Sequence, residues 1–297
     1  GVFYAIYGFL AAINKTKVIM VATIGLNILN IIFNYILIFG KFGFPALGIA
    51  GAALGTVVAQ GLGTLFFVVY ILMSPETKPY GCLRFTSFHR KIFVDLLRSA
   101  GPIIIQLSIA LLIFLYYESV IANIGTLFLA ATHIVFTVFV LKRTIVGGFA
   151  EGGSILVGNA LGEGERREAV RYAYAAEFIA IVIGLVLFCG ILVFSEQIVG
   201  IFNSDAELAD VGSWALRFFA LFFFIEAVGF PFEVIFTHNG WSRYVLMSVI
   251  VTNVVCIIGC TLLFTRVFDF GIYGAWSAFA LYLVGHGLFM FAGFFSW

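Results

Sequence analysis

Charge is scarce in this sequence. Asp, Glu, Lys and Arg make up only 10 % of its 297 residues, whereas soluble domains contain about 25 %. Hydrophobic residues account for 63 %, well above the roughly 45–50 % of a soluble domain. These proportions exclude a soluble enzyme and a disordered protein. The net charge is only +1, so the composition gives no reason to expect nucleic acid as a partner.

Cysteine is equally sparse. The four cysteines, Cys82, Cys189, Cys256 and Cys260, show neither a pairing pattern nor the ligand spacing of a zinc site. A disulfide-stapled secreted domain is therefore excluded, and we expect these cysteines to be packing residues, with no metal site. The first residues do not combine a basic segment, a short apolar core and a cleavage site, so we expect no signal peptide there.

Long apolar segments dominate the rest of the sequence. A membrane-spanning helix needs about 20 mostly apolar residues. Eight segments are long enough, and a further one at 1–13 is too short to cross a bilayer. We therefore predict an all-α polytopic membrane protein whose partner is the lipid bilayer. Its spans are expected at 18–39, 48–73, 101–122, 127–149, 173–195, 213–237, 244–265 and 272–295.

Basic residues gather on alternate loops between these spans. Eleven of them fall in one set of loops and only two in the opposite set. Because Lys and Arg are concentrated in cytoplasmic loops, we expect a multi-pass protein of the cell (inner) membrane. The loops expected in the cytoplasm lie near 14–17, 74–100, 163–171 and 238–243.

The 74–100 loop has its own pattern. Apolar residues recur there at helical spacing opposite charged ones, which predicts an amphipathic helix on the cytoplasmic membrane surface. We expect this linker to separate two lobes. Residues 1–73 would be the end of the first lobe, a partial span and two full ones, and residues 101–297 a second lobe of six spans. The apolar positions of the predicted helix are Phe88, Ile92, Phe93, Leu96 and Leu97.

An internal repeat supports two halves. Segments 48–52 and 271–275 share the pattern Gly-Ile-x-Gly-Ala and lie 223 residues apart. Each follows an Asn, Asn27 or Asn253, that stands ten residues after a basic residue. Six spans separate the copies, so both have the same orientation, as in transporters built from two parallel halves. By this offset we expect the chain to be a fragment that lacks three spans and part of a fourth.

Several segments together resemble the multidrug and toxic compound extrusion (MATE) transporters. Residues 30–40 followed by 48–53 resemble that family's fifth and sixth helices. Residues 130–134 resemble the early part of its eighth helix, and residues 157–164 the turn between its eighth and ninth helices. The resemblance covers essentially the whole chain, as spans four to twelve of two parallel six-helix halves.

The resemblance implies a secondary exporter rather than an enzyme. The family exports cationic or amphipathic compounds against an inward flow of sodium ions or protons, so we expect no cofactor beyond the coupling ion. Some members carry a Glu in the seventh helix where this sequence has Ala110, with Gln106 one turn earlier. The family's helix-ten Asp corresponds to Glu226. These departures leave the coupling ion open between sodium and the proton.

Two carboxylates in the 213–237 span are the leading candidates for coupling. Glu226 and Glu233 are seven residues apart, so at about 100° per residue they share one helix face. Pro231 lies between them and is expected to kink the helix and free the carbonyl of Ala227. Carboxylates at bilayer depth mark an ion pathway or a partnered structural site, and we favour the pathway.

The 127–149 span and its extension carry a polar stripe. His133, Thr137, Thr144 and Glu151 fall near one line along the helix, which predicts a wet cavity with Glu151 as a further coupling candidate. Lys142 and Arg143 lie off this stripe, and at membrane depth they are expected to pair with carboxylates, Glu226 or Glu118. Glycines around Glu151 suit either close packing or gating.

The remaining polar groups within spans are weaker candidates. Asn27, Asn30 and Asn34 form a stripe that suits either a cavity wall or a bridge between helices. His286 stands among apolar residues and is interpreted as a packed core histidine, and His238 as a solvated helix end. Alternative functions stay open. They are a lipid-linked flippase of the same superfamily, which a basic cavity would favour, and an intramembrane enzyme, against which the scattered histidines speak.

Overall fold

The computed structural model describes residues 1–81, 89–203 and 205–296, and these are helical without any strand. The chain divides into two compact units, Gly1–Phe88 and His89–Trp297. Two of the positions discussed above, Cys82 and Phe88, lie outside the described residues.

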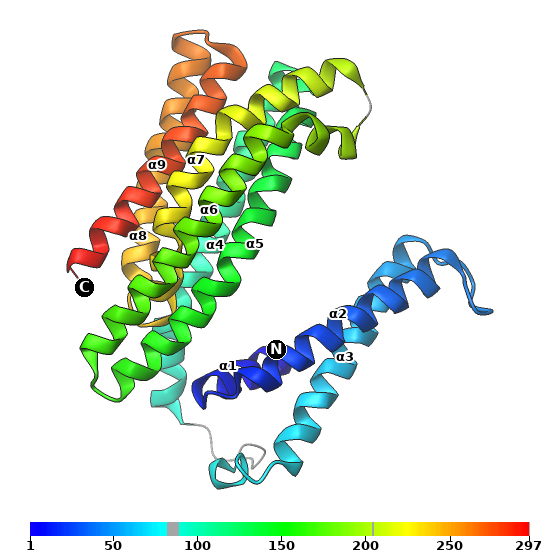
Figure 1. Cartoon of the computed structure of the whole chain (residues 1–297), viewed down its shortest axis with the longest axis vertical. Helices are drawn as coiled ribbons and strands as arrows, with labels where there is room; N and C mark the ends of the chain where they lie inside the picture. Colours follow the sequence, from blue (N-terminus) through cyan, green and yellow to red (C-terminus); the bar gives the residue numbers. More distant parts are fainter. Residues whose placement is uncertain (82–88, 204, 297) are drawn as a thin grey trace. The chain divides into compact units, whose positions relative to one another are not determined.

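The first unit contains a helical hairpin. Helix α1 (Val2–Ala12) is short, and α2 (Thr16–Phe39) and α3 (Ile49–Met73) are long and pack side by side (Figure 1). A 3-10 turn, η1 (Lys78–Tyr80), follows. A salt bridge joins Lys15, just before α2, to Glu76, just after α3. It therefore ties the start of α2 to the segment that follows α3.

The second unit is a bundle of long helices (Figure 1). Helix α7 packs against α5, α6, α8 and α9 and contributes the largest set of buried residues among the described part of the unit. The elements are α4 (Arg90–Ile124), α5 (Thr126–Gly162), α6 (Arg166–Phe202), α7 (Ala206–His238), α8 (Ser242–Thr252) with its continuation η2 (Asn253–Cys260) and η3 (Leu263–Val267), and α9 (Gly271–Ser296).

The predicted spans are confirmed. Eight helices of the described chain are long and apolar enough to cross a membrane, one for each predicted segment. Their outer faces carry large exposed apolar side chains, such as Ile31, Leu112 and Val186, which suits contact with lipid. The chain is thus a multi-pass membrane protein. Helix α1 has only 11 residues, as expected for the segment too short to cross.

The linker differs in one respect from the sequence-based expectation. The amphipathic residues from Arg90 onward are not a separate helix, because they form the first turns of α4, which runs on through Pro102 to Ile124. A proline inside a helix removes one hydrogen bond but need not end it. Residues 89–100 are exposed, apart from the half-buried Val94. The division into two lobes at this linker stays a prediction.

The two repeat copies share local geometry. Gly48, which precedes α3, has φ +53°, and Gly271, which begins α9, has φ +54°. Such left-handed backbone favours glycine. The second glycine of each copy, Gly51 or Gly274, faces the backbone of the preceding helical segment so closely that a side chain there would clash. Both copies therefore close a helical hairpin in the same way.

Aromatic packing fills the centre of the second unit. Trp276 is 1 % exposed, and its indole Nε1 donates a hydrogen bond to Thr132 Oγ1 over 3.0 Å. The Tyr117 hydroxyl donates to the carbonyl of Ala275 over 2.9 Å. A second aromatic cluster around Phe232 packs α7 against the end of α9. The indole N–H of Trp276 and the hydroxyl of Tyr117 thus each have a hydrogen-bond acceptor, as buried Trp and Tyr side chains require.

Candidate functional site

A cluster of ion pairs lies inside the second unit. Lys142 of α5 forms a salt bridge with Glu226 of α7, and their side chains are 2 % and 3 % exposed. The neighbouring Arg143 reaches both carboxylates. Its Nε lies 3.4 Å from Glu226 Oε1, and its guanidinium also forms a salt bridge with Glu233. Arg143 therefore bridges the two acidic residues of α7.

Two further helices converge on Glu233. Gln106 of α4 donates from Nε2 to Glu233 Oε1 over 3.4 Å. On the other side, His286 Nε2 of α9 lies 3.3 Å from Glu233 Oε2. Glu233 is thus the point at which α4, α5 and α9 all meet α7.

Glycine allows this convergence. At Gly229, a Cβ atom would lie 2.6 Å from the carbonyl oxygen of Gly287 and 2.7 Å from its Cα, so the backbones of α7 and α9 touch there. Gly229 stands between Glu226 and Glu233 on the same face of α7. On the α5 side, the ring of Phe230 lies against Gly147 and also receives Arg143, whose Cζ is 4.1 Å from the ring centroid. These contacts let α7 approach α5 and α9 closely enough for the charged side chains to meet between them.

The charges of the cluster balance. Two cations, Lys142 and Arg143, face two carboxylates, and each carboxylate oxygen has a nitrogen donor nearby. Lys142 also donates to the carbonyl of Phe223 over 3.4 Å. Buried charges persist only when paired and hydrogen-bonded in this manner. A sodium ion would have to displace one of these donors from its oxygen, whereas a proton needs only a lone pair.

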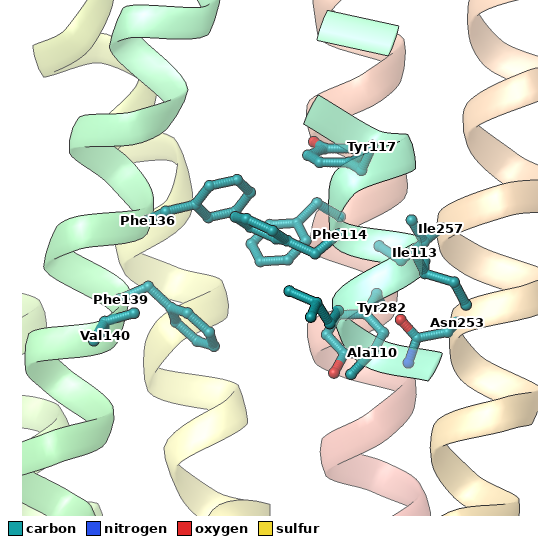
Figure 2. A pocket seen from close by; sticks show the side chains of 12 residues that line it. Ala110, Ile113, Phe114, Tyr117, Phe136, Phe139, Val140, Asn253, Ile257 and Tyr282 are labelled. Atoms are coloured by element: carbon teal, nitrogen blue, oxygen red, sulfur yellow. The ribbon is translucent and has the colours of Figure 1, made fainter. Parts of the chain in front are cut away.

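An aromatic pocket of about 330 Å³ lies between α4, α5, η2 and α9. Figure 2 shows the rings of Phe114 and Phe136 pointing toward one another across it, with Asn253 and Tyr282 on one wall. Asn253 and Ile257 belong to η2, which is a π-helix. π-Helical turns are rare and concentrate at functional sites. The π-helix in its wall therefore indicates that the pocket is a candidate binding site.

The polar stripe predicted along the 127–149 span is divided in the structure. His133 Nδ1 lies 3.5 Å from Glu118 Oε1, and Glu151 Oε2 lies 3.7 Å from His238 Nδ1. Thr137 and Thr144 donate their hydroxyls to carbonyls of their own helix. The structure thus brings Lys142, Arg143, Gln106 and both acidic residues of α7 together, but it does not bring His133 or Glu151 to them.

The asparagine stripe belongs to the first unit. Asn30 Nδ2 donates to Thr56 Oγ1 of α3 over 3.2 Å, and Asn34 Nδ2 donates to Asn30 Oδ1 over 3.2 Å. Asn27 donates to the carbonyl of Thr23 in its own helix. Asn30 therefore links α2 to α3, supported by Asn34 within α2, which is the bridging arrangement left open by the sequence.

Two buried groups were not singled out from the sequence as site residues. His286 is buried, as expected, but it is not isolated, because it contacts Glu233 and Ser248. Its partners lie on other helices, so no spacing within the sequence reveals them. Glu177 of α6 is 5 % exposed, and neither carboxylate oxygen has a hydrogen-bond partner among the described residues. It lies on an alanine-rich face that gives no sign of polar packing.

Apolar spans that enclose a balanced set of charges define a multi-pass membrane protein built around an intramembrane polar site. Residues 102–262, over half of the chain, match the family model described as MatE. The chain belongs to this family. Its members are transporters rather than enzymes, which speaks against the intramembrane enzyme considered above.

Individual relatives agree with this assignment. The chain is 31 % identical over 191 residues to the "Probable multidrug resistance protein NorM" of Agrobacterium fabrum, a match that covers 64 % of this chain and 41 % of that protein. It is 25 % identical over 288 residues to the protein of the same name from Neisseria meningitidis, with 92 % and 60 % covered. The chain thus matches no more than about three fifths of these curated relatives.

Solved structures show the same fold. The MATE transporter VcmN of Vibrio cholerae, in a mutant form, superposes with a TM-score of 0.80 at 19 % identity, covering 99 % of this chain and 64 % of that one. At 19 % identity, this similarity supports a shared fold and no more.

Proposed function

We propose that this chain is part of a secondary exporter of cationic or amphipathic small molecules. Two lobes would give access to the two sides of the inner membrane in turn, driven by an inward flow of protons or sodium ions. Membership in the MatE family and the multidrug resistance names of its relatives support the export of such molecules. The loops near 14–17, 74–100, 163–171 and 238–243 are proposed to face the cytoplasm.

One observation carries the proposal to particular residues. Lys142 and Glu226 are buried inside the second unit, and the partly buried Arg143 and Glu233 adjoin them, together with Gln106 and His286, beside an aromatic pocket. Charges at this depth are costly to bury and commonly mark an ion pathway. Because every carboxylate oxygen there already has a donor, the arrangement favours the proton over sodium as the coupling ion.

The flippase alternative predicts a wide basic central cavity. The residues that line the aromatic pocket include no charged residue. The two basic residues nearest the carboxylates, Lys142 and Arg143, are both engaged in salt bridges. An apolar, aromatic cavity next to compensated charges suits an amphipathic cation better than an anionic lipid headgroup.

The test is dye export by purified protein in liposomes, using the protein together with the preceding spans that we expect. Glu226→Gln and Glu233→Gln each keep the side-chain shape but remove a charge, so we expect ion-driven export of ethidium to be lost. Glu196→Gln is the matched control, since the Glu196 side chain is 68 % exposed and pairs with Arg217. Wild-type export rates in both cluster variants would refute the role of this cluster in coupling.

A further inference from the structure

His286 is held on both of its ring nitrogens. The residue is 3 % exposed, with Nε2 3.3 Å from Glu233 Oε2 and Nδ1 3.1 Å from Ser248 Oγ. In a neutral imidazole one nitrogen donates and the other accepts, whereas both donate in the protonated ring. Glu233 accepts from Nε2 in either state.

Ser248 makes the second nitrogen adaptable. Its hydroxyl can donate to a bare Nδ1, or it can turn toward the carbonyl one helical turn earlier in α8 and accept from a protonated Nδ1. Rotation of a single hydroxyl therefore satisfies both protonation states of His286.

The groups that face His286 come from every helix packed around it. Glu233 of α7, Ser248 of α8 and Tyr282 of α9 contact it directly. Through Glu233 it joins the set of Arg143 and Lys142 on α5, Glu226 on α7 and Gln106 on α4. The other titratable groups on the elements around it are Tyr244 on α8 and Cys256 on η2. Because the fixed cations and carboxylates of this set balance, a proton on His286 adds one uncompensated positive charge. In the low-dielectric interior that charge acts strongly on its surroundings.

Tyr282 connects this charge to the aromatic pocket. Its ring stacks on the imidazole of His286, with ring centroids 5.7 Å apart and an angle of 17° between the planes. The same tyrosine forms part of the pocket wall (Figure 2). A molecule in the pocket is therefore separated from the imidazole by one aromatic ring.

We propose that His286 is a proton-binding residue, and that a proton on it and an organic cation in the aromatic pocket exclude each other. The pocket's phenylalanine rings suit the apolar, aromatic body of such a cation. Repulsion between the two positive charges weakens each ligand in the presence of the other, and linkage makes the effect reciprocal. Mutual exclusion of this kind is what an exchange of protons for cations requires. This inference rests on the proposed function.

Equilibrium binding of ethidium to the purified protein, carrying the preceding spans that we expect, is the test. In sodium-free buffer we expect wild-type affinity to be about tenfold weaker near pH 5.5 than near pH 8, a factor within the usual range of coupling between sites. His286→Gln should keep the affinity seen near pH 8 and lose the pH dependence. His133→Gln, which changes a membrane histidine outside the cluster, should behave as the wild type.

A second variant protects the test against misfolding of His286→Gln. Ser248→Ala removes a hydrogen bond from both protonation states of His286, but the bond from the charged ring is roughly twice as strong as the one to the neutral ring, so the change in affinity should shift to lower pH. A pH-independent wild-type affinity, an unchanged pH dependence in His286→Gln, or no dye binding at any pH would each overturn the inference. When His286→Gln does not fold, an unshifted Ser248→Ala profile overturns it.

Binding and export separate the two proposals. Proton-sensitive binding without gradient-driven export would refute the exporter and leave the His286 assignment intact. Export by a protein whose dye binding is insensitive to pH would do the reverse.

Discussion

The pair formed by Lys142 and Glu226 allows a quantitative test of the cluster. Both side chains are almost fully buried, so removing one partner leaves the other charge without compensation. Breaking a buried ion pair in this way costs about 3–5 kcal/mol. We expect Glu226→Gln to fall in this range, because Lys142 then loses its charged partner and is left with neutral acceptors, the amide of the new Gln and the carbonyl of Phe223 at 3.4 Å.

The reciprocal change should cost less. In Lys142→Met, Glu226 keeps Arg143, whose Nε is 3.4 Å from its Oε1, so we expect a loss nearer 2–3 kcal/mol, below the range for a fully orphaned charge. The double variant removes both charges and leaves Arg143 with Glu233. Since uncharged replacements of buried pairs are often neutral, we expect it to lie within about 1 kcal/mol of the wild type.

The free energy of unfolding is measured by titrating the protein in mixed detergent micelles with sodium dodecyl sulfate. The control pair is Arg217 and Glu196, whose side chains are 47 % and 68 % exposed. Pairs of that kind contribute about 0–1 kcal/mol, so Glu196→Gln should change little. The reasoning is refuted when Glu226→Gln is no less stable than Glu196→Gln, or when the losses of the single variants simply add in the double variant.

Three further outcomes follow from other contacts. Gly229→Ala should destabilise the protein by at least about 1–3 kcal/mol, since its Cβ would meet the Gly287 backbone, whereas Gly148→Ala, with open space around it, should be neutral in the same titration. Asp205→Ala should cost about 0.5–2 kcal/mol in the same titration, because the Asp205 carboxylate accepts from the first backbone N–H groups of α7, and Asp205→Asn should not. Labelling of intact cells with an impermeant thiol reagent should fail at Glu165→Cys and succeed at Glu207→Cys, and the reverse would overturn the proposed orientation.

Hydropathy alone was sufficient to predict which segments form the membrane-spanning helices. Each predicted segment corresponds to one long helix, because a run of about 20 apolar residues has few alternatives in a membrane. Helix ends were harder to place. The sequence predicted a helix around 88–97, but nothing in it shows that this helix runs on without a break into the span as α4, or that the segment after Thr252 winds as a π-helix. Such details depend on neighbouring helices rather than on local pattern.

Within the site, the sequence predicted which residues share a face of one helix, but it did not predict which residues of different helices contact one another. The seven-residue interval placed Glu226 and Glu233 on one face, and depth in the membrane required partners for Lys142 and Arg143. The sequence left those partners open, and the structure supplies Glu226 and Glu233, while Glu118 meets His133. His286 was missed as a partner of Glu233 because a residue's neighbours on other helices leave no periodic signal.

The backbone contact between Gly229 and Gly287 also has a mechanical consequence. Since no side chain is interposed, the crossing point of α7 and α9 would act as a fulcrum for a tilt of either helix, with the aromatic side chains that pack α7 against α9 shifting as it tilts. Glu226 and Glu233 lie on opposite sides of this fulcrum along α7, about 10 Å apart for seven residues of helix. A small tilt would draw one carboxylate toward its cations while moving the other away, so the two ends of the cluster act as the arms of one lever.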